Sequence, residues 1–383
     1  MIKVGIIASL RGMWQGGVNY YKNLWSCYQQ NPDPAVKLAI FTPHPEDVSC
    51  YECDAIEVHP WPEMTSRPPW NYPRRATRRI IGYDPAILKF LKRHRVDLLS
   101  HCEIGKQTSI NTLWWQPDFQ HKVFPKYFSR KECAYRDSIV ANTKRWGNIL
   151  LSSNAAANDF RRFYPELASV RPHVLRFSCA AIVDMVSLSR EELAAHYPVI
   201  EPYFFLPNQF WQHKNHRVVI EALRQVSPKI RVICTGPMDD RRDPGYVPGL
   251  MAKVKEFGLE ERFICLGTVP YNILVSLMHH SLAVVQPSMF EGWSTSVEES
   301  KAMCKQIVLS NIDVHREQAP ERGVYFSPES PEELATCLTR LYFEFSPATE
   351  LIFANQRSHF KTRIEREWIE QFSQIMKTVA RGH

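Results

Sequence analysis

Two glutamates and a lysine in the second half of the sequence have the right types and spacing to bind a phosphorylated, hydroxyl-rich ligand. Glu291 and Glu299 lie eight positions apart on either side of a Gly-Trp-Ser-Thr-Ser turn, and carboxylates accept hydrogen bonds from hydroxyl groups. Lys214 precedes a predicted helix, and lysine carries a compact, flexible charge that can neutralise a diphosphate. These residue types predict a ligand that carries both hydroxyl and phosphate groups.

The elements around Glu291 place it where ligands bind in open α/β sheets. The apolar run at residues 282–285 predicts a buried strand that stops at Pro287, and a helix is predicted to begin near Val297. Glu291 and Gly292 therefore lie at the carboxyl end of a strand. The free N–H groups and positive end of the following helix favour a phosphate. Three hydroxyl residues are candidate N-caps for that helix: Ser294, Thr295 and Ser296.

Glu299 has a second interpretation that involves no ligand. The segment Ser296-Val-Glu-Glu299 has the spacing of a capping box, in which the glutamate side chain reaches back to the start of its own helix. Because capping boxes are common, the sequence leaves both roles open for Glu299.

The first half of the chain begins as a Rossmann-like domain does. A strand is predicted over residues 3–8, and a helix runs from Gly16 and Gly17 to about residue 29. Two glycines allow a ligand to approach the backbone closely. Because the pattern is not Gly-x-Gly-x-x-Gly, a dinucleotide site is disfavoured.

A loop rich in aromatic residues follows a strand-like segment in the first half. It reads Trp114-Trp-Gln-Pro-Asp-Phe-Gln-His121. Flat rings such as that of Trp115, beside Asp118 and His121, suit a carbohydrate pocket. A histidine alone is more often structural, and it is the neighbouring residues that favour a binding role here.

Positive charge is concentrated in the first half of the sequence. Residues 1–190 hold 26 Lys and Arg against 16 Asp and Glu, whereas residues 191–383 hold 21 against 24. A helix predicted over residues 84–95 follows a segment at 59–80 that is rich in Pro, Trp and Arg. This pattern fits an anionic membrane surface, at about 1 kcal/mol per basic residue, and equally fits a solvated helix face. The helix carries four basic side chains beside an apolar side: Lys89, Lys92, Arg93 and Arg95.

Composition indicates an ordinary soluble globular protein of two or three domains. The chain has 383 residues, of which 44% are hydrophobic and 23% charged. No apolar run approaches the length of a membrane span, and the apolar N-terminal segment is too short for a secretory signal. The ten cysteines are therefore expected to be free thiols in a cytoplasmic protein.

The second half alternates strands and helices, which predicts a mainly parallel sheet covered on both faces. We expect an N-terminal domain over residues 1–185 and a C-terminal domain over 186–359, with residues 178–200 as a linker. A C-terminal helix is predicted within residues 360–383. Strands are predicted at residues 203–206, 230–235, 263–266, 282–285, 307–309 and 323–326, with helices at 216–226, 246–257, 271–279, 297–303 and 331–343.

The stretch at residues 286–303 resembles the Glu-x7-Glu motif of the family-4 retaining glycosyltransferases. Residues 114–121 and 207–216 resemble the same family in the same order along the chain. This resemblance implies the GT-B fold, in which two Rossmann-like domains face each other across a cleft and a terminal helix crosses back to the first domain. In the donor site it implies that Glu291 holds sugar hydroxyls, that Glu299 binds the ribose, and that backbone amides hold the diphosphate at Gly292, Trp293, Ser294 and Thr295.

The resemblance also implies roles for residues outside that stretch. Lys214 corresponds to a lysine that contacts the donor phosphates, and His121 to a histidine beside the reacting sugar carbon. Many members carry an arginine near the position of Asn208, so this chain lacks one of two positive charges there. The remaining implied contacts are Gly16, Gly17, Asn208 and Gly267 on the donor, and Trp115 and Asp118 on the acceptor side.

The implied reaction moves a hexose, taken as mannose from GDP-mannose, from a nucleoside diphosphate sugar to a hydroxyl with retention of configuration. Surface polysaccharide or lipopolysaccharide biosynthesis is the implied setting, with a growing glycan or lipid-linked glycan as acceptor. No metal or cofactor is expected, since no dense acidic metal motif appears in the sequence and GT-B enzymes generally need no metal. The resemblance implies that the leaving phosphate takes the acceptor proton, so no side-chain nucleophile is predicted. An anionic membrane surface is a further expected partner, at the cytoplasmic face, and no nucleic acid is expected.

Two other classes of function stay open. One is a different GT-B enzyme, such as a nucleotide-sugar epimerase or a phosphorylase, and a phosphorylase would need pyridoxal phosphate on a lysine. The other is a non-catalytic protein that binds RNA or another anion through the basic, aromatic first half, although no recognised nucleic-acid motif appears.

Overall fold

The chain forms two compact units, which we describe separately. The computed structural model describes residues 1–13, 15–61, 77, 80–185, 187–199, 202–240 and 242–382. Unit 1 comprises Met1–Phe177 and Ile364–His383, and unit 2 comprises Ser178–Arg363. Residues 178–200, expected to be a linker, belong to unit 2 and form the short helices η6 (Ala180–Asp184) and α7 (Arg190–His196).

Unit 1 is built on a seven-stranded parallel sheet. Its strand order is β3-β2-β1-β4-β5-β6-β7, and the inner strands are buried on both faces, as is usual for parallel sheets. The strands are β1 (Ile2–Ile7), β2 (Val36–Thr42), β3 (Ile56–Pro60), β4 (Leu98–Ser100), β5 (Asn111–Gln116), β6 (Asn148–Leu151) and β7 (Arg171–Val174).

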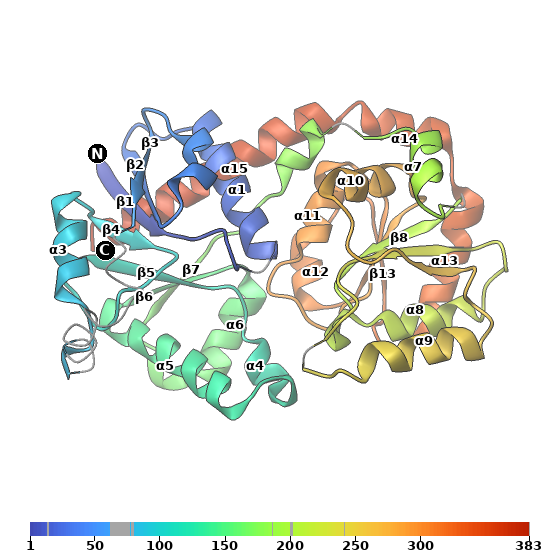
Figure 1. Ribbon diagram of the computed structural model, residues 1–383, viewed down its shortest axis with the longest axis horizontal. Coiled ribbons are helices and arrows are strands. Elements are labelled where there is room, and N and C mark those ends of the chain that lie inside the picture. Colours follow the sequence, from blue (N-terminus) through green and yellow to red (C-terminus); the bar gives the residue numbers. More distant parts are fainter. Residues whose placement is uncertain are drawn as a thin grey trace. The chain divides into compact units, whose positions relative to one another are not determined.

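Helices cover both faces of this sheet (Figure 1). The helices α1 and α15 lie together on one face, where Lys377 pairs with Asp33 at 2.8 Å and the rings of Tyr28 and Phe372 meet. On the other face α3, α5 and α6 bury apolar side chains against the strands. The helices are α1 (Gln15–Gln30), α3 (Pro85–Arg93), α4 (Gln120–Val123), α5 (Arg130–Trp146), α6 (Asn154–Phe163) and α15 (Arg357–Ala380).

Unit 2 is built on a six-stranded parallel sheet with the order β10-β9-β8-β11-β12-β13. Its strands are short apolar runs, and the central four are buried except for Pro207 at the end of β8. They are β8 (Phe204–Pro207), β9 (Val232–Thr235), β10 (Phe263–Cys265), β11 (Val284–Gln286), β12 (Ile307–Ser310) and β13 (Gly323–Phe326).

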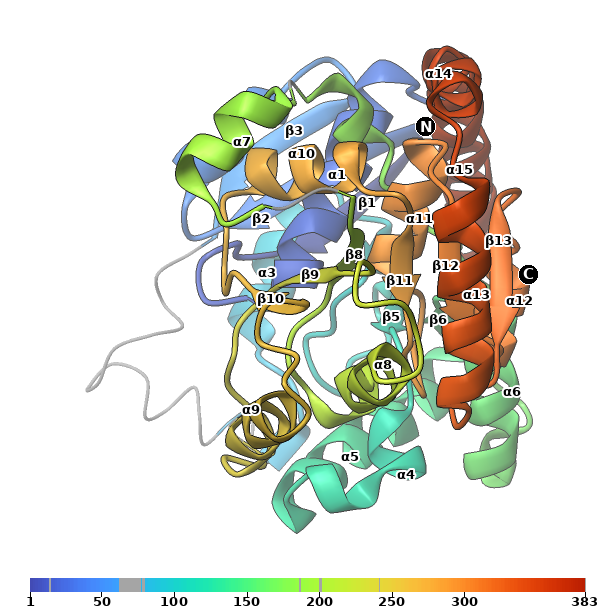
Figure 2. The ribbon, with the colours of Figure 1, turned by 90° about the vertical axis from the view of Figure 1, so that its right-hand side faces the viewer.

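Two layers of helices enclose the sheet of unit 2. The helices α8, α9 and α13 form the main apolar core with one face, and α10 and α11 lie on the other, as Figures 1 and 2 show. The helices are α8 (His216–Leu223), α9 (Tyr246–Glu256), α10 (Tyr271–His280), α11 (Thr295–Ala302), α12 (Asp313–Gln318), α13 (Pro331–Glu344) and α14 (Pro347–Ala354).

Each sheet reverses its strand order at one point, between β1 and β4 in unit 1 and between β8 and β11 in unit 2. In open α/β sheets, ligands bind outside the carboxyl ends of the strands at such a switch point. In unit 2 that position belongs to the loops after β8 and β11, which carry Lys214 and Glu291.

The structure confirms the expected fold class, two parallel α/β units of the Rossmann-like type. The C-terminal helix α15 starts in unit 2, and its residues from Ile364 onward belong to unit 1. The basic segment predicted at residues 59–80 lies largely outside the described residues. Within the described chain, no helix combines the length and apolar character needed to cross a membrane.

Candidate functional site

The loop after β8 carries Lys214 and is tied to neighbouring loops of unit 2. Asn215 takes a left-handed conformation with φ 58° just before α8, and its side-chain amide donates to the carbonyls of Pro287 (3.1 Å) and Pro328 (2.8 Å). The backbone N–H of Met289 donates to the carbonyl of His213 at 2.8 Å. The loops after β8 and β11 are therefore joined by hydrogen bonds.

Lys214 and Glu291 form an ion pair at the switch point. The Lys214 Nζ lies 2.6 Å from Glu291 Oε1, and the two side chains are only 15% and 9% exposed. Ser288 Oγ (2.7 Å) and Gln286 Nε2 (3.0 Å) donate to the same oxygen. Within the described residues no donor contacts Oε2, so that oxygen is left to accept a hydrogen bond from a ligand.

The electrostatics keep Glu291 ionised. Burial raises the pKa of Glu291, but the charge of Lys214 and the hydrogen bonds from Lys214 and Ser288 outweigh it, so that the pKa is lowered. Burial, together with the Lys214 charge, lowers the pKa of His213 to about 3, so this imidazole is neutral at physiological pH. Lys214 is therefore the cation at this position.

Asn208 is a buried residue that holds Gln286 beside Glu291. It is 4% exposed, and its side-chain amide donates to Gln286 Oε1 at 2.6 Å. Gln286 in turn donates to Glu291 and to Ser294 Oγ, the latter at 2.9 Å. Gly236, with φ 130°, packs against this segment so closely that a Cβ there would lie 2.5 Å from the Asn208 carbonyl oxygen. Asn208 thus orients the residues around Glu291.

The helix α11 begins two residues earlier than predicted, at Thr295 instead of Val297. Its N-cap is Ser294, whose side chain forms no capping bond to the helix and accepts from Gln286 instead. The N–H groups of the first turn have no intrahelical acceptor, as at any helix start. They follow directly after Glu291, Gly292 and Trp293, of which Trp293 is buried.

Glu299 lies in α11 and is bound by a tyrosine. The Tyr271 hydroxyl donates to Glu299 Oε1 at 2.7 Å, and burial raises the pKa of Glu299 to about 7. Ser296 is the second residue of α11, and its hydroxyl donates to the carbonyl of Pro207. The capping-box interpretation of Glu299 is therefore wrong.

Gly267 lies in the loop between β10 and α10 with φ 67°, and its carbonyl accepts from the N–H of Gly236 at 2.8 Å. A Cβ at Gly267 would have nothing within 4 Å. The backbone conformation, not crowding, is thus what favours glycine here.

The predicted residues of the first half belong to unit 1. Gly16 and Gly17 lie in the first turn of α1. Trp115 ends up inside the unit, 6% exposed, with its ring stacked on Tyr20 at 4.2 Å. The Asp118 carboxylate accepts from the N–H of Gln120 at 2.9 Å, at the start of α4.

His121 is buried in α4. Its Nε2 lies 3.0 Å from Asp137 Oδ1 and 3.1 Å from the Tyr164 hydroxyl, and burial lowers its pKa against the opposing effect of Asp137. Its Nδ1 has no hydrogen-bond partner among the residues that the structure describes. Nε2 is thus held by hydrogen bonds, whereas Nδ1 has no partner among the described residues.

Unit 2 therefore brings together Lys214, Glu291 and, through Gln286, Asn208. Gln286 and Ser288 were not predicted from the sequence as site residues, although both lie in the stretch at residues 286–303. Ser288 lies three residues before Glu291 in the same loop, and this short spacing is the sequence feature that could have indicated their hydrogen bond. Within the described chain, no group of three or more His, Cys, Asp and Glu side chains is placed to hold a metal ion.

Sequence comparison finds a family match within unit 2. Residues 195–344 match the family model described as "Glycosyl transferases group 1", which confirms the expected resemblance to glycosyltransferases. The O-antigen chain mannosyltransferase RfbU of Salmonella typhimurium is 24% identical over 141 residues, which are 37% of this chain and 38% of RfbU. The alignment thus spans under two fifths of that relative.

Solved structures share the fold of the whole chain. A glycosyltransferase from Rickettsia africae ESF-5 gives a TM-score of 0.71 at 15% identity, covering 100% of this chain and 99% of that one. Anabaena Alr3699/HepE, in complex with UDP and glucose, gives 0.68 at 16% identity, covering 99% and 100%. These likenesses confirm the GT-B class of fold.

Proposed function

We propose that this chain, whose residues 195–344 match the group 1 glycosyltransferases, transfers a hexose from a nucleoside diphosphate sugar to a hydroxyl of a cell-surface glycan or lipid-linked glycan, with retention of configuration. The observation that carries the proposal is the Lys214–Glu291 pair at the switch point of unit 2. It presents one cation and one carboxylate oxygen side by side, which suits a ligand with both phosphate and hydroxyl groups.

In this proposal the donor lies across the start of α11. Glu291 Oε2 accepts a hydrogen bond from a sugar hydroxyl, and Lys214 faces the diphosphate. The first-turn N–H groups of α11 add partial positive charge at the same place. Charge grows on the leaving diphosphate as the glycosidic bond breaks, so these groups stabilise the transition state electrostatically.

Glu299 is proposed to bind the ribose. Its carboxylate is held by Tyr271 through Oε1, and within the described residues no donor contacts Oε2. A ribose hydroxyl would supply the missing hydrogen bond. Burial raises the pKa of Glu299 to about 7. A hydrogen bond from a ribose hydroxyl would favour the ionised form of the carboxylate.

Retention is proposed to follow front-face attack, in which the acceptor hydroxyl bonds to the anomeric carbon as the leaving phosphate departs. The acceptor proton passes to that phosphate, so no side-chain nucleophile or metal is required. We propose His121 as a contributor on the unit 1 side, where Asp137 and Tyr164 hold its Nε2 and its buried Nδ1 has no partner among the described residues.

The proposed donor is GDP-mannose, which is supported by the similarity to an O-antigen chain mannosyltransferase. Because a structural neighbour binds UDP and glucose, the experiment must compare bases and sugars. Thermal shifts with UDP, GDP and ADP sugars would rank the donors, since ligands that bind only the folded state raise the melting temperature. Transfer from the best donor to a lipid-linked glycan extract would follow, with the product anomer read by proton NMR.

Retained configuration in the product supports the proposal, and an inverted product overturns the mechanism. An epimerised nucleotide sugar, or turnover that depends on inorganic phosphate, would replace transfer by another GT-B activity. RNA binding that weakens with salt, without any sugar transfer, would favour the non-catalytic alternative.

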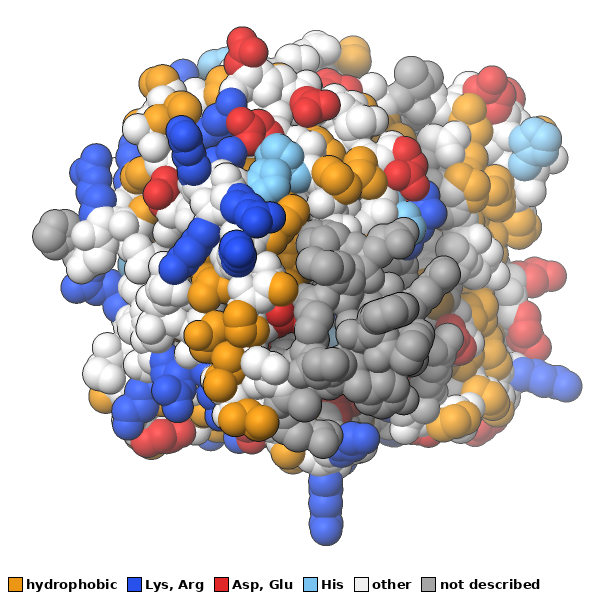
Figure 3. Space-filling model, turned by 60° about the vertical axis from the view of Figure 1, so that its left-hand side comes forward, with side chains coloured by type: hydrophobic (Ala, Val, Ile, Leu, Met, Phe, Trp, Pro, Cys, Tyr) orange, Lys and Arg blue, Asp and Glu red, His pale blue; other side chains and the backbone are white. Residues whose placement is uncertain are grey.

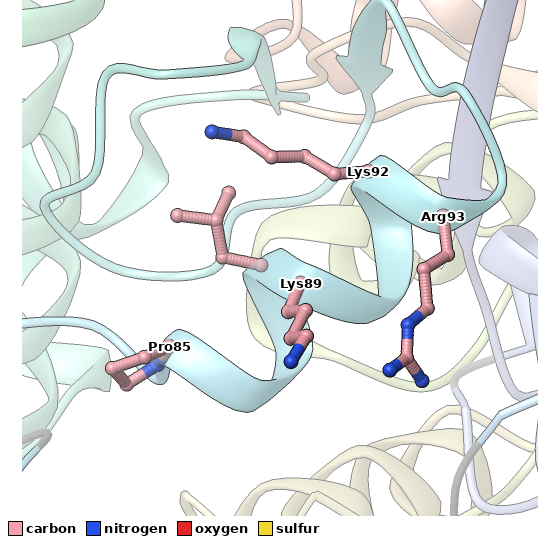
Figure 4. Close-up of a pocket in the computed structure, with 5 residues that line it drawn as sticks. Pro85, Lys89, Lys92 and Arg93 are labelled. Carbon is pink, nitrogen blue, oxygen red and sulfur yellow. The ribbon is translucent and has the colours of Figure 1, made fainter.

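A membrane surface is proposed as a further partner, through the helix α3. Its outer side carries Lys89, Lys92 and Arg93, which with Pro85 and Leu88 line an open hollow of about 380 Å³ (Figure 4). Among the described residues none of these three cations has an ion-pair partner. Ile80, 83% exposed, lies just before the helix.

Figure 3 brings this side of the molecule forward and shows Lys and Arg side chains beside hydrophobic ones. Unpaired cations next to exposed apolar side chains are suited to anionic headgroups and the adjoining acyl region. This surface would keep the enzyme near a lipid-linked acceptor.

A further inference from the structure

The amide side chain of Gln318 forms hydrogen bonds with Ser294, the N-cap residue of α11. Gln318 is the last residue of α12 and is 3% exposed. Its Oε1 accepts from the backbone N–H of Ser294 at 3.3 Å, while its Nε2 donates to the Ser294 carbonyl at 2.9 Å. The same Nε2 donates to Glu298 Oε1 at 2.9 Å. One side chain thus satisfies both backbone groups of the N-cap residue.

His315, three positions earlier, reaches the other end of the same loop. Residues three apart lie on one side of a helix, and His315 is fully buried. Its Nδ1 lies 2.9 Å from the Ser310 carbonyl and 3.1 Å from Ser310 Oγ. Ser310 Oγ donates to the carbonyl of Ser288, and Ser288 Oγ donates to Glu291 Oε1. Three hydrogen bonds therefore link His315 to Glu291.

The charge state of His315 is compatible with this linkage. Burial lowers the pKa of His315 to about 4, although the nearby Glu291 opposes this effect. A neutral imidazole with its proton on Nδ1 donates to the Ser310 carbonyl and leaves Nε2 without a proton. Within the described residues Nε2 has no partner. This nitrogen is thus a buried acceptor, and the ring is held by Nδ1 alone.

We propose that His315 and Gln318 are positioning residues of the donor site, a proposal that rests on the proposed glycosyl transfer. Together they form a clamp (His315 and Gln318) that fixes residues 288–294 at both ends. The clamp holds Glu291 against Lys214 and keeps the first N–H groups of α11 in a constant direction. Neither residue needs to touch the donor. Fixed dipoles and charges lower a barrier because they do not reorient during the reaction.

The test compares variants of each clamp residue in the full-length protein. Gln318→Glu keeps the shape but cannot donate to the Ser294 carbonyl, and Gln318→Ala removes both bonds. His315→Leu removes the bond to Ser310, while His315→Asn retains a donor near the position of Nδ1. Glu321→Gln, an exposed change three residues beyond the clamp, is the matched control. Melting temperature and circular dichroism identify any variant that fails to fold.

Hydrogen exchange of residues 287–298 is the first readout, because it does not depend on activity. Gln318→Glu, Gln318→Ala and His315→Leu should exchange faster there, whereas His315→Asn and the control should match the wild type. The second readout is transfer kinetics. A misplacement of about 1 Å costs roughly 100-fold, so kcat should fall by about 10- to 100-fold while KM changes little. His315→Asn should restore most of kcat.

Unchanged exchange in the three disruptive variants, or an unchanged kcat, would overturn the clamp. A loss that appears only in KM would also overturn it, since it would indicate direct donor contact. If the wild-type protein transfers no sugar from any donor, the proposed function fails, while the exchange data still decide whether the clamp restrains the loop.

Discussion

The Lys214 ammonium lies 2.6 Å from Glu291 Oε1, although the two residues are 77 positions apart in the sequence. They follow the two strands between which the sheet of unit 2 reverses its order. Both side chains are mostly buried, and each lacks an alternative partner of opposite charge among the described residues. A charge pair built in this way at a switch point indicates a ligand site.

Replacing Glu291 by glutamine should abolish most sugar transfer without unfolding the protein. The amide retains an oxygen for Ser288 and Gln286 but loses the charge that holds Lys214 and the sugar hydroxyl. Loss of one such group typically lowers kcat by about 100- to 1,000-fold, which steady-state kinetics would measure. Glu260→Gln, on the surface of unit 2, serves as the control. A Glu291→Gln enzyme with a normal turnover rate would refute its role.

Glu291→Ala should also destabilise unit 2. It leaves the Lys214 charge largely buried and unpaired, and breaking a buried pair in this way costs about 3–5 kcal/mol. Because the Lys214 side chain keeps 15% exposure, the lower end of that range is expected. Urea unfolding of wild type, Glu291→Ala and the double variant Glu291→Ala/Lys214→Met would measure it. The double variant should recover part of the loss; equal stability of all three would contradict the coupling.

Lys214→Met should weaken binding of nucleoside diphosphates more than of nucleosides. A hydrogen bond to a charged group contributes about 1.5–3 kcal/mol, so the dissociation constant for the diphosphate should rise by at least about tenfold. Titration calorimetry with the diphosphate and the matching nucleoside separates the two contributions. Lys255→Met, exposed on α9, controls for the loss of charge elsewhere. Equal weakening for both ligands would place Lys214 away from the phosphates.

Much of unit 2 was predictable because each of its buried strands is a short apolar run. The strand β13 and the starts of α8, α9, α10 and α13 lie at the residues predicted from the sequence. The helix α14 was missed because its apolar residues do not mark one buried face: Leu351 and Ile352 are 63% and 60% exposed. Ser346 and Pro347 at its start are nevertheless ordinary helix-initiation signals.

The meeting of Lys214 and Glu291 was also predictable, since the carboxyl ends of parallel strands share one edge of a sheet. The hydrogen bonds around these two residues were not predictable, because such bonds depend on side-chain directions that no local sequence pattern encodes. Gln318, which lies in another helix 24 positions away, forms hydrogen bonds with Ser294. The capping box, one of the two roles left open for Glu299, requires Ser296 as the N-cap, and the observed helix start at Thr295 places Ser296 inside α11.

The stability of the protein should depend on Glu299 between about pH 4.5 and pH 7. Its pKa is raised in the folded state to about 7, so the folded protein binds a proton more tightly than the unfolded chain. The contribution of Glu299 to the free energy of unfolding is therefore complete below the pKa of the unfolded chain, and it is lost as the pH rises through 7. By pH 8 the loss amounts to about 3 kcal/mol. Glu299→Gln should remove this dependence.

Melting temperatures of the wild type and Glu299→Gln at pH 5 and pH 8 would test this expectation. The variant should melt higher than the wild type at pH 8 and close to it at pH 5. Glu260→Gln again controls for a general charge effect. A difference between wild type and Glu299→Gln that does not change with pH would contradict the raised pKa.

Neutralising the outer side of α3 should release the protein from anionic vesicles. Lys89, Lys92 and Arg93 are exposed and form no ion pair among the described residues, so each is available to a lipid headgroup. At about 1 kcal/mol per basic residue, the triple change to glutamine should weaken binding by roughly 100-fold. Sedimentation with vesicles of phosphatidylglycerol and phosphatidylcholine, against phosphatidylcholine alone, measures this partition.

The control for α3 is a triple change of equal charge on unit 2, Lys253, Lys255 and Arg217 to glutamine, which lies outside the proposed surface. It should leave vesicle binding within about threefold of the wild type, because screening confines the attraction to charges within about 10 Å of the headgroups. Transfer to a short water-soluble acceptor should be unaffected by the α3 change, since those residues have no part in the donor site. If both triple variants lose vesicle binding equally, attraction follows net charge and α3 is not the docking surface.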